Sequence, residues 1–176
     1  KTYVDLPQYN GDFRAMPAYM DAGDWDAAAV KWVNVHPDNS HARDLPTVMG
    51  LVIYSDPATG APLAVIDGTV LTRKRTGAAA AVATDHLAVE DATSLGIVGA
   101  GIQSYTQLSA IAAVRPIDEV VVSDVDDAAR QAFIDSFPEF DIRAGGVEAA
   151  AQCDVLSTVT PVTEPIIDAG MPAEHT

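Results

Sequence analysis

The chain has 176 residues, enough for one large domain or two small ones, and 48% of them are hydrophobic, which favours a folded core over disorder. Acidic residues outnumber basic ones by 25 to 10, and the net charge of −15 argues against a nucleic-acid partner, because phosphate binding needs the opposite sign. The single cysteine excludes an internal disulfide framework, and no apolar run reaches the ~18 residues of a membrane span.

The acidic residues are spread along the chain, which indicates a solvated acidic surface rather than an acidic tail. We expect this surface to suit a salt-rich, halophilic cytoplasm, since salt screens self-repulsion; an ordinary acidic protein is the alternative. No basic and apolar leader opens the chain, so a cytoplasmic location is expected. No Cys and His group has metal-ligand spacing, so no metal site is predicted, and Cys153 is expected to be a small buried hydrophobe.

The first half of the chain predicts a β-meander followed by a helix. Residues 30–35, 48–54 and 62–66 are apolar, strand-like runs, and a turn containing Pro and Gly separates the last two. A helix is expected to follow from a cap at Thr72 to Leu87. These elements predict an α+β domain.

Strands and helices alternate in the second half of the chain. Strands are predicted at 94–98, 119–123, 141–144 and 154–159, with helices at 103–113, 128–137 and 147–152 between them. This alternation predicts a parallel sheet with right-handed crossovers. We therefore expect two domains, 1–90 and 91–176. Because a complete doubly wound domain has about six strands, the sequence is expected to be an incomplete part of an enzyme.

The turn after the first strand of the second domain has the spacing Gly99-x-Gly101-x-x-Ser104. Gly99 allows a tight turn, Gly101 lets the backbone approach a pyrophosphate, and the following helix N-terminus attracts its charge. Ser104 replaces a third glycine and is small enough for close helix–strand packing. The pattern predicts a Rossmann-type nucleotide domain, so the fold class is α/β: a partial parallel sheet of about four strands plus an α+β domain with a β-meander.

The end of the second parallel strand predicts which dinucleotide binds. Asp124 is placed to accept from a ribose 2′-hydroxyl and to repel a 2′-phosphate, and no arginine offers a phosphate clamp, so NAD is expected over NADP. Val125 and Asp126 follow on the same loop, although Asp126 could simply belong to the acidic surface. Thr158 and Thr160 are expected at the carboxyl edge of the sheet near the ribose or nicotinamide. The alternative is that they only form the connection from the strand to the next loop and contact no ligand.

Three basic residues are candidate functional groups because the chain has so few. Lys31 lies in an apolar strand, where lysine is costly unless it faces an edge, is paired or has a function, and burial tunes a lysine toward general-base work. Arg14 and Arg75 could each hold a carboxylate or a phosphate through two hydrogen bonds. An outward strand position for Lys31 and surface salt bridges for the arginines are the alternatives.

Several segments together resemble one enzyme family. The stretches Val-Lys-Trp-Val-Asn-Val-His-Pro-Asp-Asn at 30–39 and Leu-Thr-Arg-Lys-Arg-Thr-Gly-Ala-Ala at 71–79 are similar to motifs of the ornithine cyclodeaminase/μ-crystallin family. The resemblance continues through residues 45–50, 56–64, 67–69 and 96–103. It covers nearly the whole chain, and the archaeal alanine dehydrogenases are the branch that the chain resembles most.

The resemblance implies a homodimer built on the first domain and an NAD-dependent reaction at the Cα of a small L-amino acid. By motif match, Lys31 would be the catalytic acid/base and Arg14 would bind the substrate carboxylate, with Arg75 near both carboxylate and cofactor. The remaining residues implied in the NAD site are Thr76, Ile102, Gln103 and Asp124.

The resemblance leaves the reaction open. Alanine dehydrogenase, which converts L-alanine to pyruvate and ammonia, is the first expectation; ornithine cyclodeaminase, which forms L-proline, is the alternative. A ketimine reductase and a μ-crystallin-like binding protein without turnover are further alternatives, and the presence of Lys31 argues against the last. The family's catalytic aspartate and N-terminal helix have no counterpart in these residues, so poor cofactor affinity and no turnover are expected of them alone.

Overall fold

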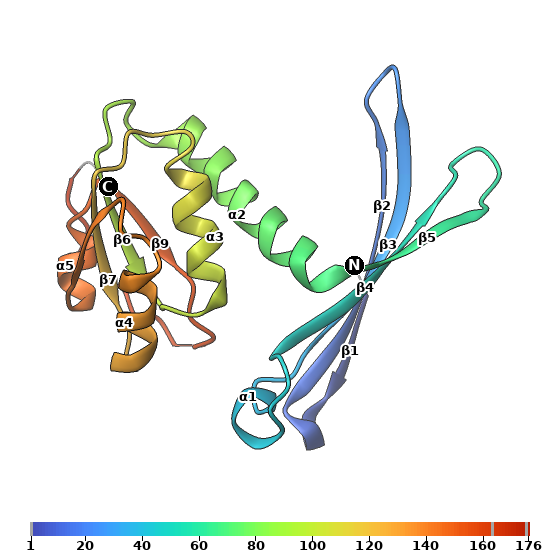
Figure 1. Ribbon diagram of the computed structural model, residues 1–176, viewed down its shortest axis with the longest axis horizontal. Helices are drawn as coiled ribbons and strands as arrows, with labels where there is room; N and C mark the ends of the chain where they lie inside the picture. The colour runs from blue at the N-terminus through green and yellow to red at the C-terminus, as the bar shows by residue number, and fades with distance from the viewer. Residues whose placement is uncertain (1, 163, 175) are drawn as a thin grey trace. The chain divides into compact units, whose positions relative to one another are not determined.

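The computed structural model describes residues 2–162, 164–174 and 176 (Figure 1). The chain forms two compact units, 1–72 and 73–176. The division lies within helix α2 (Gly68–Leu87), earlier than the boundary expected at residue 90. The reason is that Ala80 and Ala88 pack against the core of the second unit, so most of the helix belongs there.

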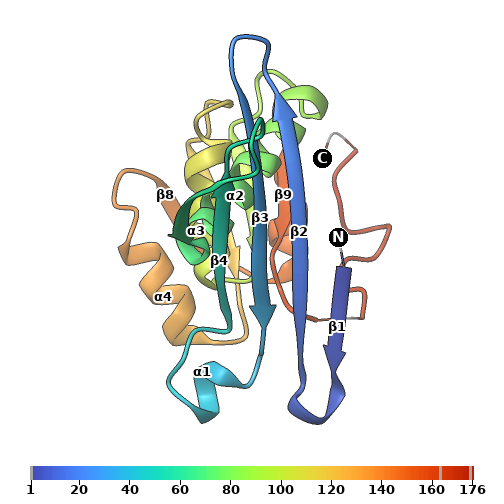
Figure 2. The ribbon, with the colours of Figure 1, turned by 90° about the vertical axis from the view of Figure 1, so that its right-hand side faces the viewer.

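The first unit is a five-stranded antiparallel sheet in which every strand pairs with its neighbour in the chain, confirming the predicted meander (Figure 2). In the order of the sheet the strands are β1 (Thr2–Leu6), β2 (Gly11–Asp21), β3 (Asp26–Val35), β4 (Val48–Ser55) and β5 (Pro62–Asp67). The short helices η1 (Pro7–Tyr9) and α1 (Asn39–Ala42) lie in its connections. The first two strands were not predicted, since β1 is short and Pro17 interrupts the strand pattern of β2.

The two faces of this sheet differ in burial at its centre, on β3 and β4. Residues directly opposite one another share a face, so Lys31 and Val52 lie on the face that also holds Val33. Val33 and Val52 are 3% and 5% exposed. The other face, called here the exposed apolar face, carries large hydrophobic side chains that are 39% to 66% exposed: Val4, Trp32, Leu51, Ile53 and Val65.

The second unit is a four-stranded parallel sheet with the order β8-β7-β6-β9. Its strands are β6 (Ser94–Val98), β7 (Glu119–Ser123), β8 (Asp141–Ala144) and β9 (Val155–Thr158). Numbered within the unit, the order is 3-2-1-4, with a crossover back to the far side of the first strand. This is the strand order of a dinucleotide-binding fold, and it confirms the predicted partial Rossmann-type sheet.

Helices α3 (Ile102–Ile111), α4 (Asp127–Asp135) and α5 (Val147–Ala151) cover this sheet. Leu95, Val120 and Phe133 belong to the core that includes residues of α3 and α4, whereas Val121 and Ala150 belong to the core under α5. A Cβ on Gly96 would overlap the carbonyl oxygen of Ala150, so glycine permits this close contact between strand and helix.

Two further details of the fold bear on the predictions. Cys153 is 5% exposed within the core under α5, which confirms its role as a small buried hydrophobe, and burial raises the pKa of its thiol. Thr72 does not cap α2, because the helix begins four residues earlier at Gly68 and the Thr72 hydroxyl donates back to the Gly68 carbonyl at 2.6 Å. Across the described residues, every helix is too short or too polar to cross a membrane.

Candidate functional site

The carboxyl ends of β6, β7 and β9 surround a hollow of about 390 Å³ in the second unit. Gly99 and Gly101 line it from the turn after β6, Asp124 and Val125 from the end of β7, and Thr160 from the segment after β9. The hollow lies where the strand order reverses between β6 and β9. Ligands of open parallel sheets bind at this place, because the loops leaving neighbouring strands diverge there.

The turn after β6 has the geometry that a bound phosphate requires. Gly99 adopts φ +105°, a conformation that favours glycine, and its N–H donates to the Ser123 carbonyl at 2.8 Å. A Cβ at Gly101 would meet nothing within 4 Å, so the backbone is open to a ligand. Gly101 is also the N-cap of α3, and no side chain caps this helix start. Its amide groups therefore point toward the space that an anion would fill.

Ser104 is completely buried, and its hydroxyl donates to the Gly101 carbonyl at 2.6 Å. This explains how the turn tolerates serine at the position of the third glycine: the side chain is small, and its one polar group is satisfied within the helix start. Ile102 is 54% exposed, whereas Leu108 and Ile111 on the same helix are buried.

Gln103 supplies a further test of whether the turn fits a nucleotide. Its side-chain oxygen is buried and has no hydrogen-bond partner among the described atoms. A buried amide without a partner is costly unless a ligand or water satisfies it. The oxygen can only accept a hydrogen bond, so its partner would be a donor such as a cofactor hydroxyl or a water. The feature of the turn that fits a phosphate is the open backbone at Gly101 with the amides of the helix start.

Asp124 ties the glycine turn to the loop after β7. One carboxylate oxygen accepts from the Ala100 N–H at 2.5 Å, and the other accepts from the Asp126 N–H at 2.9 Å. Asp124 is half-buried and lines the hollow, where the sequence placed it. Val125 is fully exposed, and one carboxylate oxygen of Asp126 caps α4 through the N–H groups of Ala128 and Ala129.

An arginine that the sequence analysis did not single out bonds to the backbone of Asp124, although it does not line the hollow. Arg130, in the first turn of α4, donates from Nη1 to the Asp124 carbonyl at 3.1 Å and from Nη2 to Asp127 at 2.7 Å. Sequence reasoning missed it because only helix α4 brings residue 130 back to the end of β7. Arg130 follows Asp124 by six residues, and a helix begins between them. This spacing is the sequence signal that could have placed the arginine near the end of β7.

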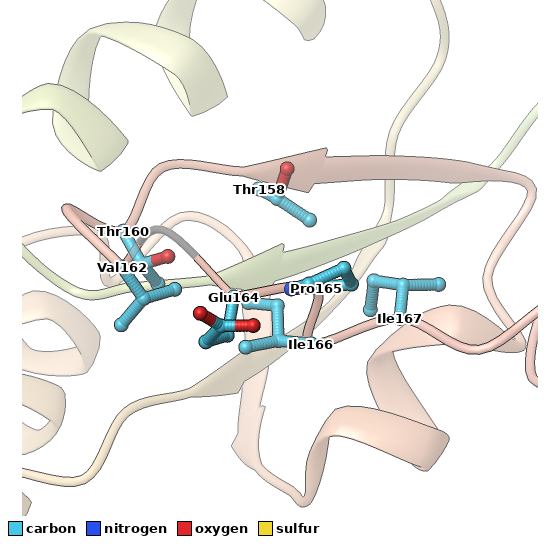
Figure 3. Close-up of a pocket in the computed structure, with 7 residues that line it drawn as sticks. All are labelled: Thr158, Thr160, Val162, Glu164, Pro165, Ile166 and Ile167. Atoms are coloured by element: carbon cyan, nitrogen blue, oxygen red, sulfur yellow. The ribbon is translucent and has the colours of Figure 1, made fainter.

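A second hollow of about 330 Å³ lies along the segment after β9 (Figure 3). Thr158 and Thr160 line it together with Glu164, which the sequence did not single out. The two hollows share the lining residues Thr160, Val162 and Ile166, so they lie next to each other along the segment that follows β9. Both threonines therefore lie at the edge where they were predicted.

In the first unit, Lys31 lies on the face of the sheet that packs against the start of α2. Its Nζ donates to the Thr72 hydroxyl oxygen at 3.2 Å, and its neighbours across the sheet are Met16 on β2 and the buried Val52 on β4. The ammonium is therefore held over an apolar strand by a buried hydroxyl. No sequence signal marked Thr72 as its partner, since 41 residues separate them.

Arg14 lies on the same face of the sheet as Lys31, two positions along the register on neighbouring strand β2. Its guanidinium binds the Asp12 carboxylate through two parallel hydrogen bonds of 2.6 and 2.7 Å. The side-chain hydrogen bond to Asp12 raises the pKa of Arg14, and the guanidinium also lies 5.3 Å from the centre of the Tyr3 ring. Asp12 was not predicted, although residues two apart on a strand share a face.

Arg75 and Thr76 lie on the part of α2 that belongs to the second unit. Arg75 is exposed and Thr76 is half-buried. A Cβ on the next residue, Gly77, would overlap the Thr106 carbonyl oxygen, so α2 packs closely against α3 at this level. The helix bearing Arg75 and Thr76 is thereby fixed to the helix that follows the glycine turn.

Comparison with known proteins is consistent with this geometry. The chain is 41% identical to the alanine dehydrogenase of Archaeoglobus fulgidus, over 100% of this chain and 53% of that protein. The structure of Thermococcus litoralis Delta(1)-pyrroline-2-carboxylate reductase in complex with NADH and L-proline matches with a TM-score of 0.94 and 36% identity, over 99% of this chain and 55% of that one. An archaeal alanine dehydrogenase dimer with bound NAD matches with a TM-score of 0.90 and 40% identity, over 99% and 53%.

The chain thus spans about half the length of these proteins. A sequence profile matches it over residues 1–174, which include both the antiparallel sheet with Lys31 and the parallel sheet with the glycine turn. The resemblance expected from the motifs is confirmed: the chain belongs to the ornithine cyclodeaminase/mu-crystallin family.

Proposed function

We propose that this chain is part of an NAD-dependent oxidoreductase that acts at the Cα–NH2 of a small L-amino acid in a salt-rich cytoplasm, with L-alanine as the substrate. The observation that carries the proposal is the placement of Lys31. Its ammonium is hydrogen-bonded to the buried Thr72, on the same sheet face as Arg14. A protein that only stores a nucleotide has no need of a lysine held in this way.

Arg14 is the proposed ligand of the substrate carboxylate. Its two parallel hydrogen bonds to Asp12 present the guanidinium in the orientation that a carboxylate requires. The Arg14 side chain is still 28% exposed, so an incoming carboxylate can use its remaining edge or displace Asp12. The cost of binding is reduced because the side chain is already ordered.

Lys31 is the proposed acid/base for the substrate amine. Thr72 accepts from Lys31 and donates its own proton to the Gly68 carbonyl, so it orients the lysine without supplying a proton. In its neutral form Lys31 would take a proton from the substrate amine during oxidation, and the resulting ammonium would return it in the reverse direction. A bound nicotinamide supplies the hydride acceptor at Cα.

The proposed NAD site is formed by the two adjacent hollows of the second unit. The amides at the start of α3 would hold the pyrophosphate, and Asp124 would accept from the ribose. Gln103 would line the site, its side-chain oxygen accepting from a donor of the cofactor. Arg75 and Thr76 are proposed to contact the cofactor from α2, and Thr158 and Thr160 to contact it from the end of β9. The structures of family members with bound NAD or NADH support this assignment.

Product analysis tests the proposed reaction. The full-length protein that contains this chain, given L-alanine and NAD⁺, is expected to produce pyruvate, ammonia and an equal amount of NADH. With L-ornithine it is expected to produce nothing. Formation of proline from ornithine without net NADH would instead establish the cyclodeaminase reaction. If the only activity were consumption of NADH with a cyclic imine as substrate, the protein would be a reductase.

We also propose that the protein is a homodimer whose subunits meet through the exposed apolar face of the antiparallel sheet. Soluble monomers rarely expose an apolar patch that runs across several strands, and the alanine dehydrogenase with bound NAD is a dimer. Leu51→Lys, in the middle of this face, is expected to convert the dimer to monomers in sedimentation velocity. Leu87→Lys, at an 85% exposed leucine of the second unit, is the control and is expected to leave the dimer intact. A Leu51→Lys protein that still sediments as a dimer would exclude this face.

A further inference from the structure

Arg14 is held in one orientation by two neighbours on its face of the antiparallel sheet. Its Nε and Nη2 atoms donate to the Asp12 carboxylate at 2.6 and 2.7 Å. Its guanidinium carbon lies 5.3 Å from the ring centre of Tyr3, which is directly opposite on β1. A guanidinium carries its N–H groups in a fixed plane, so Asp12 occupies one edge and leaves the edge between Nη1 and Nη2 for a ligand. A carboxylate bound at that edge has the Asp12 carboxylate close beside it.

The surroundings of this pair are negatively charged. Asp12 is directly opposite Asp5 in the register of β1 and β2, so the two carboxylates share a face of the sheet. Both line a hollow of about 410 Å³ together with Asn10 and Val35. Asn10 also donates to the Asp38 carboxylate, at 3.1 Å. The described residues that line this hollow include no basic side chain, so its potential opposes the approach of an anion.

We propose that Asp12 is a positioning residue that limits Arg14 to a single carboxylate, so that the substrate class is amino acids without an anionic side chain. The inference rests on the proposed function, in which Arg14 binds the substrate carboxylate. Asp12 acts through Arg14: its two hydrogen bonds fix the open edge, and its charge opposes a second carboxylate near that edge. Dicarboxylic amino acids are thereby excluded by charge.

The balance of charges explains this selection. The first carboxylate gains two charge-assisted hydrogen bonds from the open edge of Arg14, which offset its repulsion by Asp12. A second carboxylate on the same ligand has no such bonds from this edge and meets only the repulsion. Lys31, on the same face, is assigned to the substrate amine in the proposed reaction and does not compensate. Asp12 acts more strongly than Asp5, because its side chain is only 20% exposed, whereas Asp5 is exposed and its charge is screened by salt.

A matched pair of carboxylic acids tests the inference, because succinate is propionate with a second carboxylate. The dissociation constants of both acids are measured by titration calorimetry in the presence of NADH. The full-length protein that contains this chain is used as the parent and as the variants D12N, D12E and D5N. The parent is expected to bind propionate more tightly than succinate. D12N is expected to shift the ratio of the two constants in favour of succinate by about fivefold, the size of one interaction between partly exposed charges.

Two variants separate the charge at this position from other effects. D12E keeps the carboxylate and is expected to keep the parent ratio. D5N removes the same charge from the residue directly opposite and is expected to change the ratio by less than about twofold. An unchanged ratio in D12N would overturn the inference, as would an equal shift in D5N. A D12N protein that loses affinity for both acids by the same factor would also overturn it, because a purely structural role affects both acids alike. D12S replaces D12N if thermal unfolding shows that the amide disturbs the fold.

The test separates this inference from the rest of the proposed function, since the binding measurements need no turnover. A shifted ratio in D12N, with a parent that does not oxidise L-alanine, would support the role of Asp12 and overturn the proposed reaction. An unchanged ratio with an active parent would overturn only the role of Asp12. A parent that binds neither acid at millimolar concentration would overturn both the role of Arg14 and that of Asp12.

Discussion

Lys31 is a charged side chain on a strand whose neighbours across the sheet are apolar. Its position is tolerated because the Thr72 hydroxyl accepts from its ammonium at 3.2 Å, and Thr72 is itself only 6% exposed. A lysine in such a place costs desolvation free energy that a surface lysine does not. The local arrangement therefore favours a functional role over an outward-facing strand position.

In the full-length protein that contains this chain, replacing Lys31 by alanine is expected to lower turnover of L-alanine by at least about a hundredfold, because the proposed acid/base group is lost. NAD binding is expected to be unchanged, since the glycine turn lies in the other unit. Turnover is measured by NADH formation and binding by calorimetry. Lys74→Ala, at an exposed lysine of α2, is the control and is expected to keep turnover. Full turnover in Lys31→Ala would refute the role given to this residue.

At the scale of elements, the C-terminal end of α2 depends on a single arginine from a distant segment. Arg115, only 8% exposed, donates to the carbonyls of Thr84, Asp85, Ala88 and Val89 at distances of 2.8 to 3.1 Å. The last carbonyls of a helix have no partner within the helix, and a cation is favourable there. Arg115 thus holds α2 to the loop after α3.

Arg115→Met is expected to destabilise the protein by about 3 kcal/mol, because it removes the donors and leaves several buried carbonyls without partners. Urea unfolding followed by circular dichroism measures the change. Arg143→Met, at an exposed arginine, is the matched control and is expected to stay within about 0.5 kcal/mol of the parent. A similar small effect at Arg115 would show that water replaces its hydrogen bonds.

At the scale of the whole molecule, charge is the dominant feature. With 25 acidic and 10 basic residues, most carboxylates cannot each have a basic partner. The pairs that do form include Arg14 with Asp12 and Arg130 with Asp127, both within a few residues of sequence. The remaining negative charge opposes compaction of the chain, and dissolved salt screens it.

Raising KCl from about 0.1 M to 1 M shortens the screening distance from roughly 10 Å to 3 Å and is expected to stabilise the fold. A gain of about 1 kcal/mol would raise the melting temperature by ~3 °C in a chain of this size. Thermal unfolding at several KCl concentrations measures it, with sucrose of equal osmolality as the uncharged control. A melting temperature that sucrose raises as much as KCl would show that screening of the acidic surface is not the cause.

The sequence by itself determined the two kinds of sheet, the glycine turn, and the positions of Lys31 and Asp124 on their strands, because strand periodicity and turn spacing are properties of neighbouring residues. Only the tertiary structure decided which side chains meet. Arg130 donates a hydrogen bond to the Asp124 carbonyl, and Arg14 donates to the Asp12 carboxylate. Lys31 donates to the Thr72 hydroxyl, and Arg115 donates to carbonyls at the end of α2. The division within α2 was decided by packing as well. Such contacts join segments up to 41 residues apart, where no local pattern carries information about the partner.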